Sequence, residues 1–148
     1  MQTGGSSRGI TDIKQGTSDI GMVSRKLNPK ESDLTSHLLA KDGFSIIVHE
    51  SNPILELSED QIKQIYLGKI DSWKSLNDID KKITVINNAE GRSTLEVFIK
   101  YFNLKNTQIK PSIIIGDNEQ AVKLVVNNPH AIAYVSIGTA EWAFLSKP

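Results

Sequence analysis

Two segments of the sequence combine glycine with hydroxyl residues just before an expected helix. The first is residues 4–9, Gly-Gly-Ser-Ser-Arg-Gly, and the second is residues 89–94, Ala-Glu-Gly-Arg-Ser-Thr. The start of a helix presents unpaired backbone N–H groups and a partial positive charge, and Ser and Thr hydroxyls add neutral donors. Such a junction can hold a dehydrated anion without a full positive charge. The alternative, that these residues are ordinary N-caps, stays open, because Ser and Thr are strongly preferred as N-caps.

Two arginines could contribute to an anion site. Arg25 directly follows the apolar segment that ends at Ser24, and α/β sheets usually place their ligands at such strand ends. Arg92 lies inside the second junction. Either guanidinium could form a bidentate pair with an oxyanion. The alternative for each is a solvated or salt-bridged arginine, which is the commoner fate of an arginine side chain.

The composition of the chain narrows the classes of function. With 148 residues it is long enough for one compact domain, and its 17 basic and 17 acidic residues cancel. The chain therefore has no net charge that would predict a nucleic-acid or membrane-surface partner, and any anion site must depend on local geometry. The absence of cysteine excludes disulfides and most structural zinc sites. His37, His49 and His130 lack the spacing of metal ligands, so we expect neither a metal nor another cofactor.

The elements that must position these residues alternate between short apolar strands and amphipathic helices. Strands are expected at residues 19–24, 44–49, 83–87, 112–115 and 132–136. Helices are expected from the first serine pair to about residue 15, from the capping box at Ser58 to the glycine at 68, from about residue 93, and from the cap at Asp117 to about residue 127. Strands separated by helices of this length predict an α/β architecture with a largely parallel or mixed sheet. The polar, turn-rich residues 71–82 are expected to form a surface excursion.

Several segments resemble a known family in the same order along nearly the whole chain. The resembling segments are residues 5–10, 16–27, 42–48 with 52–53, 57–70 with Trp73, 90–98 and 131–136. Residues 19–27, Asp-Ile-Gly-Met-Val-Ser-Arg-Lys-Leu, are similar to the strand after the glycine-serine loop of phosphate-binding proteins of ABC importers. Residues 90–95, Glu-Gly-Arg-Ser-Thr-Leu, stand where that family has its second anion loop. The resemblance implies the Venus-flytrap fold of type II periplasmic solute-binding proteins, with the anion held between two lobes.

The resemblance also implies how the chain divides. Residues 1–49 are expected to form part of the first lobe, residues 50–136 a complete second lobe, and residues 137–148 a crossing back toward the first lobe. The family's first anion loop would lie before Met1, and its returning C-terminal segment beyond Pro148, so we expect an incomplete site. No stretch approaches the roughly 18 apolar residues of a membrane span, and no signal peptide is recognisable at the N-terminus.

The resemblance implies some of the ligand-binding residues by position, and the expected strand end at residues 24–25 adds the others. Together they are Ser6, Ser7, Ser24, Arg25, Gly91, Arg92, Ser93 and Thr94. The hydroxyls are expected to contact the anion, while Gly91 and Arg92 shape the second loop. Some family members carry an aspartate at the position of Arg25, where it accepts the proton of hydrogen phosphate. Because Arg25 cannot accept a hydrogen bond, selectivity for phosphate over sulfate does not follow from the resemblance. Asn88 stands where relatives often carry arginine, and Arg92 is expected to substitute for it.

The sequence is compatible with three functions. The resemblance implies non-catalytic binding of phosphate or a similar oxyanion, delivered to the membrane subunits of an ABC importer in the periplasm or outside the cell. The second hypothesis is an oligomerising interaction module, in which two chains with incomplete lobes form a homodimer. The third is an enzyme acting on a phosphorylated substrate. Glu90 is the one potential general base close in sequence to either loop, and a loop glutamate is usually solvated.

Overall fold

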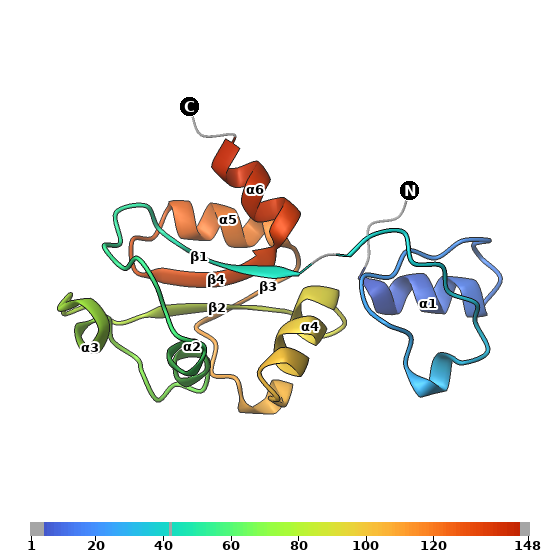
Figure 1. Ribbon diagram of the computed structural model, residues 1–148, viewed down its shortest axis with the longest axis horizontal. Coiled ribbons are helices and arrows are strands. Elements are labelled where there is room, and N and C mark those ends of the chain that lie inside the picture. Colours follow the sequence, from blue (N-terminus) through green and yellow to red (C-terminus); the bar gives the residue numbers. More distant parts are fainter. Residues whose placement is uncertain (1–4, 42, 146–148) are drawn as a thin grey trace.

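The computed structural model describes residues 5–41 and 43–145 (Figure 1). Its helices are α1 (Ser6–Lys14), α2 (Glu59–Tyr66), α3 (Lys74–Asn77), α4 (Ser93–Tyr101), α5 (Asn118–Val126) and α6 (Ile137–Leu145). Its strands are β1 (Phe44–Val48), β2 (Thr84–Asn88), β3 (Ile113–Ile115) and β4 (Ala131–Ser136). Two short 3-10 turns cover Pro29–Glu31 and Asn106–Gln108.

The four strands form one mixed sheet in the order β1-β4-β2-β3. β2 is parallel to both β3 and β4, whereas β1 is antiparallel to β4, with Phe44 opposite Ser136. The carboxyl ends of β2, β3 and β4 therefore meet at one edge of the sheet. Each of these three strands leads directly into a helix at that edge, α4, α5 and α6 respectively. The α/β architecture with a mixed sheet is confirmed.

Helices cover both faces of the sheet (Figure 1). Successive residues of a strand point to opposite faces. Accordingly, Ile132 and Tyr134 of β4 belong to one apolar cluster, which also holds residues of α2 and α4. Ala133 and Val135 belong to a second cluster, formed with α5 and with Ala140 of α6. Burial on both faces explains why β4 is almost continuously apolar in sequence.

The helix boundaries agree with the capping signals in the sequence. Ser58 caps α2: its hydroxyl accepts a hydrogen bond from the Gln61 backbone N–H (3.2 Å), and the Gln61 side chain accepts one from the Ser58 N–H (2.8 Å). Gly68 follows α2 with a φ of +71°, the left-handed conformation that ends many helices. Asp117 caps α5 by accepting a hydrogen bond from the Gln120 N–H at 2.9 Å. These predicted caps are confirmed.

Three expectations differ from the structure. Residues 19–24 form no strand, because no described segment pairs with them, and Ile20 and Met22 remain largely exposed. Residues 71–82 are more than a surface excursion, since Trp73 is fully buried and its indole N–H donates to the His130 carbonyl at 3.0 Å. Helix α6 was not predicted. It packs on α5, β1 and β4, and the expected crossing over residues 137–148 remains a prediction together with the other lobe boundaries.

Residues 5–41, here called the α1 segment, lie beside the remainder, residues 43–145, here called the sheet body (Figure 1). The α1 segment consists of α1, the 3-10 turn at Pro29–Glu31 and irregular chain. Neither apolar cluster of the described residues includes a residue before Phe44. The two parts therefore do not share a hydrophobic core.

A buried hydrogen bond in the sheet body gives a first test of this packing. The Tyr134 hydroxyl donates to Asn87 Oδ1 at 2.6 Å, and burial raises the pKa of Tyr134, so the hydroxyl remains protonated at neutral pH. Replacing Tyr134 with Phe leaves the buried Asn87 oxygen without this donor. We expect the free energy of unfolding to fall by about 1–3 kcal/mol in urea denaturation.

The matched control is Tyr101→Phe. The Tyr101 hydroxyl bonds to Glu59 at an exposed position, where the change in unfolding free energy should stay within about 0.5 kcal/mol. Equal losses for both variants would contradict a buried hydrogen bond at Tyr134.

Candidate anion-binding site

A cavity of about 150 Å³ lies at the sheet edge where β2, β3 and β4 end. Its lining residues are Ser24, Gly43, Phe44, Ser93, Thr94, Val97, Asn118 and Ser136. Ser24 comes from the α1 segment, and all the others come from the sheet body. Ser93 and Asn118 are the first residues of α4 and α5, and Ser136 directly precedes α6. The starts of three helices therefore converge on the cavity, at the carboxyl edge where α/β sheets bind ligands.

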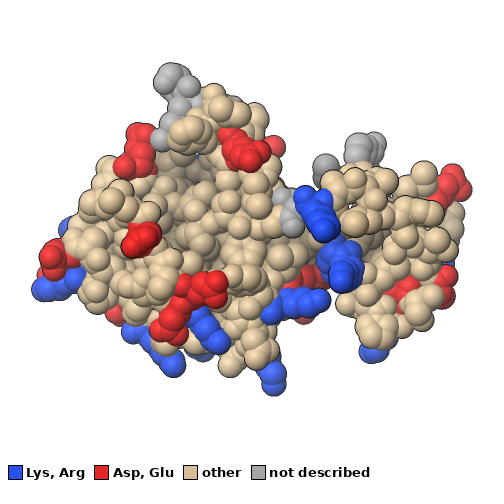
Figure 2. Space-filling model, in the orientation of Figure 1, with Lys and Arg blue, Asp and Glu red and all other residues tan. Residues whose placement is uncertain are grey.

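The cavity wall is polar but uncharged. Ser24, Ser93, Thr94 and Ser136 contribute hydroxyls, and none of the lining side chains is ionisable. Each of α4, α5 and α6 is nine residues long, so each brings the partial positive charge of a helix start to this edge. The start of α4 has no side-chain cap, whereas Asp117 caps α5 and the Ser136 hydroxyl accepts a hydrogen bond from the Thr139 N–H of α6. The arrangement can accommodate an anion through neutral donors. On the face shown in Figure 2, Lys and Arg side chains also gather where the α1 segment meets the sheet body.

The hydroxyl residues at the two junctions are not helix caps. The N-cap of α1 is Gly5 and that of α4 is Arg92, and neither makes a side-chain capping bond. The serine and threonine residues predicted from sequence lie in the first turn of each helix. The alternative of ordinary N-caps is therefore wrong for both junctions.

The two junctions, far apart in sequence, lie against each other. A Cβ atom added to Gly5 would come within 2.4 Å of the Gly91 carbonyl oxygen, so any larger residue at position 5 would force the backbones apart. Gly91 itself has a φ of +83°, in the region that favours glycine. A Cβ atom at Gly91 would be 3.7 Å from the Ser7 hydroxyl oxygen. The first turn of α1 and the loop before α4 are thus in direct contact.

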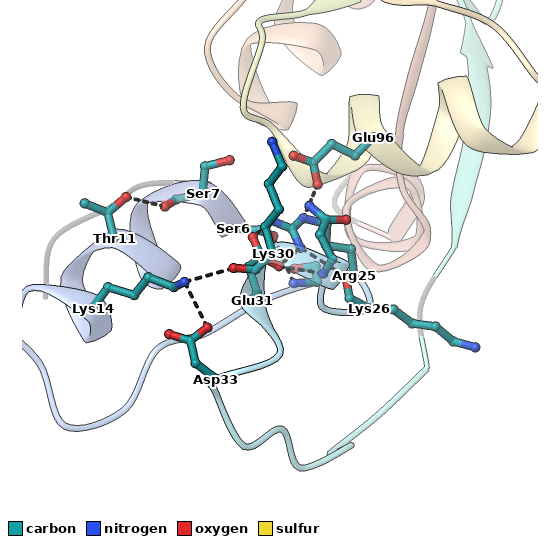
Figure 3. A network of polar contacts seen from close by, with 12 residues as sticks. Ser6, Ser7, Thr11, Lys14, Arg25, Lys26, Lys30, Glu31, Asp33 and Glu96 are labelled. Atoms are coloured by element: carbon teal, nitrogen blue, oxygen red, sulfur yellow. Dashed lines mark hydrogen bonds and ion pairs between the residues drawn. The ribbon is translucent and has the colours of Figure 1, made fainter.

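Ser6 and Ser7 differ in their surroundings. Ser6 is buried, and its hydroxyl accepts a hydrogen bond from the Ser24 backbone N–H at 3.1 Å. Ser6 does not line the cavity, but this bond holds Ser24 in the cavity wall. Ser7 is exposed, and its carbonyl oxygen accepts a hydrogen bond from the Thr11 hydroxyl at 2.9 Å (Figure 3).

Arg25 is bound to carboxylates. Its two terminal nitrogens donate to the two carboxylate oxygens of Glu31, each at 2.8 Å, and its Nε forms an ion pair with Glu96 of α4 (Figure 3). Hydrogen bonding to Glu31 raises the pKa of Arg25. The same contact, with a 2.7 Å bond from the Asn28 N–H, lowers the pKa of Glu31 from 4.5 to about 2. The sequence left open whether Arg25 pairs with an oxyanion or with carboxylates of the chain, and the structure shows the pairing with carboxylates.

Arg92 is placed differently. If a Cβ atom were added to Gly116, it would lie 3.6 Å from a terminal nitrogen of Arg92. The guanidinium therefore lies beside the start of α5. Within residues 5–41 and 43–145, we find no hydrogen bond or ion pair to this guanidinium. Asn88, at the position where relatives often carry arginine, is buried and donates to the Tyr134 carbonyl at 3.3 Å. Arg92 is therefore the more available arginine near the site.

Sequence reasoning missed part of the cavity wall. Asn118 and Ser136 were not selected, although Asn118 closely follows one predicted strand and Ser136 is the last residue of another. Arg25 was selected because α/β sheets usually place their ligands at strand ends, and the same reasoning would have identified both of these residues. Gly43 and Phe44 line the cavity because β1 is antiparallel to β4 and so begins at the same edge. That direction could not be read from the strand pattern alone.

Comparison with known proteins decides the family. The family model described as the PBP superfamily domain matches residues 1–143. The chain belongs to this family. Phosphate-binding protein PstS of Bacillus subtilis is 29% identical over 140 residues, which are 92% of this chain and 46% of that protein. The chain therefore spans about half the length of this curated relative.

Solved structures agree with this assignment. A protein from Clostridium perfringens, crystallised with bound phosphate, is 36% identical with a TM-score of 0.85, covering 90% of this chain and 56% of the other. An ABC-type phosphate transport receptor from Vibrio cholerae is 33% identical with a TM-score of 0.72, covering 93% and 59%. The fold expected from the resemblance is confirmed. Among the helices of the described residues, none has the length and apolar character needed to span a bilayer.

The Arg25–Glu31 pair gives a pH-dependent prediction. Because the pKa of Glu31 is lowered on folding, its contact stabilises the fold above about pH 4.5 and is lost as the pH falls toward 2. We expect Glu31→Gln to lower the urea midpoint at pH 7, and the difference from the parent chain to shrink steadily below about pH 4.5. Unfolding curves at pH 7, 5, 4 and 3 measure this difference.

Glu56→Gln serves as the control, since Glu56 is exposed and makes no hydrogen bond or ion pair with any described residue. Its midpoint should follow the parent chain at each pH. A constant difference for Glu31→Gln over the whole range would show that the carboxylate charge is not what stabilises the fold.

Proposed function

We propose that the chain binds inorganic phosphate, or an oxyanion of similar geometry, in the cavity at the carboxyl ends of β2, β3 and β4. The observation that carries this proposal is the convergence of three helix starts on an uncharged, hydroxyl-lined cavity of about 150 Å³. A dehydrated anion is well accommodated by neutral N–H and O–H donors arranged in this way. The names of the relatives, and the phosphate bound in one similar structure, support the same ligand.

The proposed contacts come from both parts of the chain. Ser93 and Thr94 offer their hydroxyls and the first N–H groups of α4, and Ser24 offers its hydroxyl from the α1 segment. Arg92 supplies a full positive charge beside the start of α5. Ser6, Ser7 and Gly91, also proposed from sequence, act in this arrangement through the contact between the two junctions and through the position of Ser24.

The proposed role is transport without catalysis. In this role the chain delivers its anion to the membrane subunits of an ABC importer, which the name of the ABC-type phosphate transport receptor supports. The delivery would take place in the periplasm or outside the cell. Binding and release would accompany a change in orientation between the two parts. Glu90, the base considered for an enzymatic alternative, is exposed and does not line the cavity.

The proposal is tested by removing the hydroxyls from the start of α4. A hydrogen bond to a charged group contributes about 1.5–3 kcal/mol, so Ser93→Ala with Thr94→Ala should raise the Kd for phosphate by at least about tenfold. Calorimetric titration with inorganic phosphate measures this change, and titration with sulfate measures selectivity.

The control for this variant is Ser75→Ala, which removes an exposed hydroxyl on α3, at the far end of the sheet (Figure 1). Its affinity should equal that of the parent chain. Unchanged affinity in the Ser93 and Thr94 variant would reject these residues as ligands. A parent chain that binds neither anion would reject the proposed function for this chain.

A second candidate function, self-association, is favoured by one observation. Helix α6 leaves Trp142, Phe144 and Leu145 exposed, with exposed fractions of 59%, 75% and 80%. Apolar side chains gathered on one exposed helix are typical of contact surfaces. In this proposal a second copy of the chain covers α6 in a homodimer.

Light scattering over a wide range of protein concentration tests the homodimer. We expect a dimer in the parent chain and a monomer after Trp142→Glu, because a buried unpaired charge would oppose association. A parent chain that is strictly monomeric at high concentration would reject this candidate.

A further inference from the structure

The α1 segment and the sheet body must be held in a fixed relation if Ser24 is to complete the cavity. The apolar clusters of the sheet body contain no residue of the α1 segment. The contact between Gly5 and Gly91 is a close approach of two backbones. It limits how closely the α1 segment and the sheet body can pack, but by itself it contributes little to holding them together. Polar contacts must therefore contribute to holding the two parts together.

The Arg25 ion pair provides such a contact. Arg25 lies in the α1 segment, directly after Ser24, and its Nε pairs with Glu96 in the first turns of α4 (Figure 3). Ser93 and Thr94, from the start of the same helix, line the same cavity as Ser24. The ion pair thus connects the two parts of the chain through residues one to three positions from these lining residues.

The geometry of the pair favours a rigid connection. Glu31 accepts hydrogen bonds from both terminal nitrogens of Arg25, and the remaining nitrogen, Nε, forms the ion pair with Glu96. Such a planar, bidentate arrangement fixes the guanidinium more firmly than a single contact would. The side chains are largely buried, with exposed fractions of 10% for Arg25, 12% for Glu31 and 28% for Glu96. Partial burial reduces screening by water and salt, so this pair should be stronger than an exposed surface ion pair.

We propose that Arg25 is a positioning residue rather than a ligand: its ion pair with Glu96 fixes the α1 segment to α4 and so holds Ser24 in the cavity lined by Ser93 and Thr94. The inference rests on the proposed anion binding for its functional consequence, but the connection itself does not depend on a ligand. It replaces the direct contact between Arg25 and the anion that the sequence indicated.

The connection is tested first without any ligand. The chain has no cysteine, so cysteines introduced at the exposed positions Gln15 and Lys123 can carry a pair of spin labels, one on each part. Pulsed electron paramagnetic resonance then gives the distribution of distances between them. We expect Glu96→Gln to broaden this distribution or shift it to longer distances, and a distribution identical to that of the parent chain would overturn the proposal.

Phosphate affinity gives a second test whose sign separates the two roles of Arg25. Glu96→Gln removes a negative charge near the cavity, so simple electrostatics predicts tighter anion binding. A ligand role for Arg25 predicts tighter binding as well, because the guanidinium would be released. Positioning predicts the opposite, a rise in Kd of about threefold or more, and tighter or unchanged binding would overturn the proposal.

The matched control is Glu119→Gln, which removes the same charge from the first turn of α5, beside Asn118 of the cavity wall. It should leave the distance distribution unchanged and should not weaken binding. If the parent chain binds no phosphate, the proposed function fails in the titration, while the spin-label distances still decide whether Arg25 and Glu96 connect the two parts.

Discussion

The shared direction of β2, β3 and β4 is the constraint on which the rest of the structure depends. Parallel strands bring their carboxyl ends to one edge, and the chain must leave each strand there. Because every exit leads at once into a helix, the starts of α4, α5 and α6 gather in a small volume. The anion-compatible character of the cavity thus follows from strand direction, without any excess of basic residues in the chain.

Much of this arrangement could be predicted from local sequence signals. The caps at Ser58 and Asp117 and the apolar periodicity of the helices located the elements of the sheet body closely. These caps could be predicted because a helix cap depends only on residues within one turn of the chain. Ser93 and Thr94, which line the cavity, were selected for the same reason, because they stand at a recognisable junction between a strand and a helix.

The remaining features depend on contacts between distant residues. An apolar segment such as residues 19–24 has the composition of a strand, but it becomes one only when another strand pairs with it. The partners of Arg25 are six and 71 residues away along the chain, so no spacing rule could distinguish a ligand from an ion pair. The wall formed by Gly43 and Phe44 depends on the direction of β1, which is settled only by its pairing with β4.

Phe44 occupies two environments at once. It lines the cavity, and its ring packs edge-on against Phe98 and Tyr101 of α4, with ring centroids 5.4 and 5.5 Å apart. It is also among the first residues of the sheet body after the chain leaves the α1 segment. An anion bound as proposed would therefore contact a residue that also packs into the aromatic core. The order of the Phe44 ring would then report occupancy of the cavity.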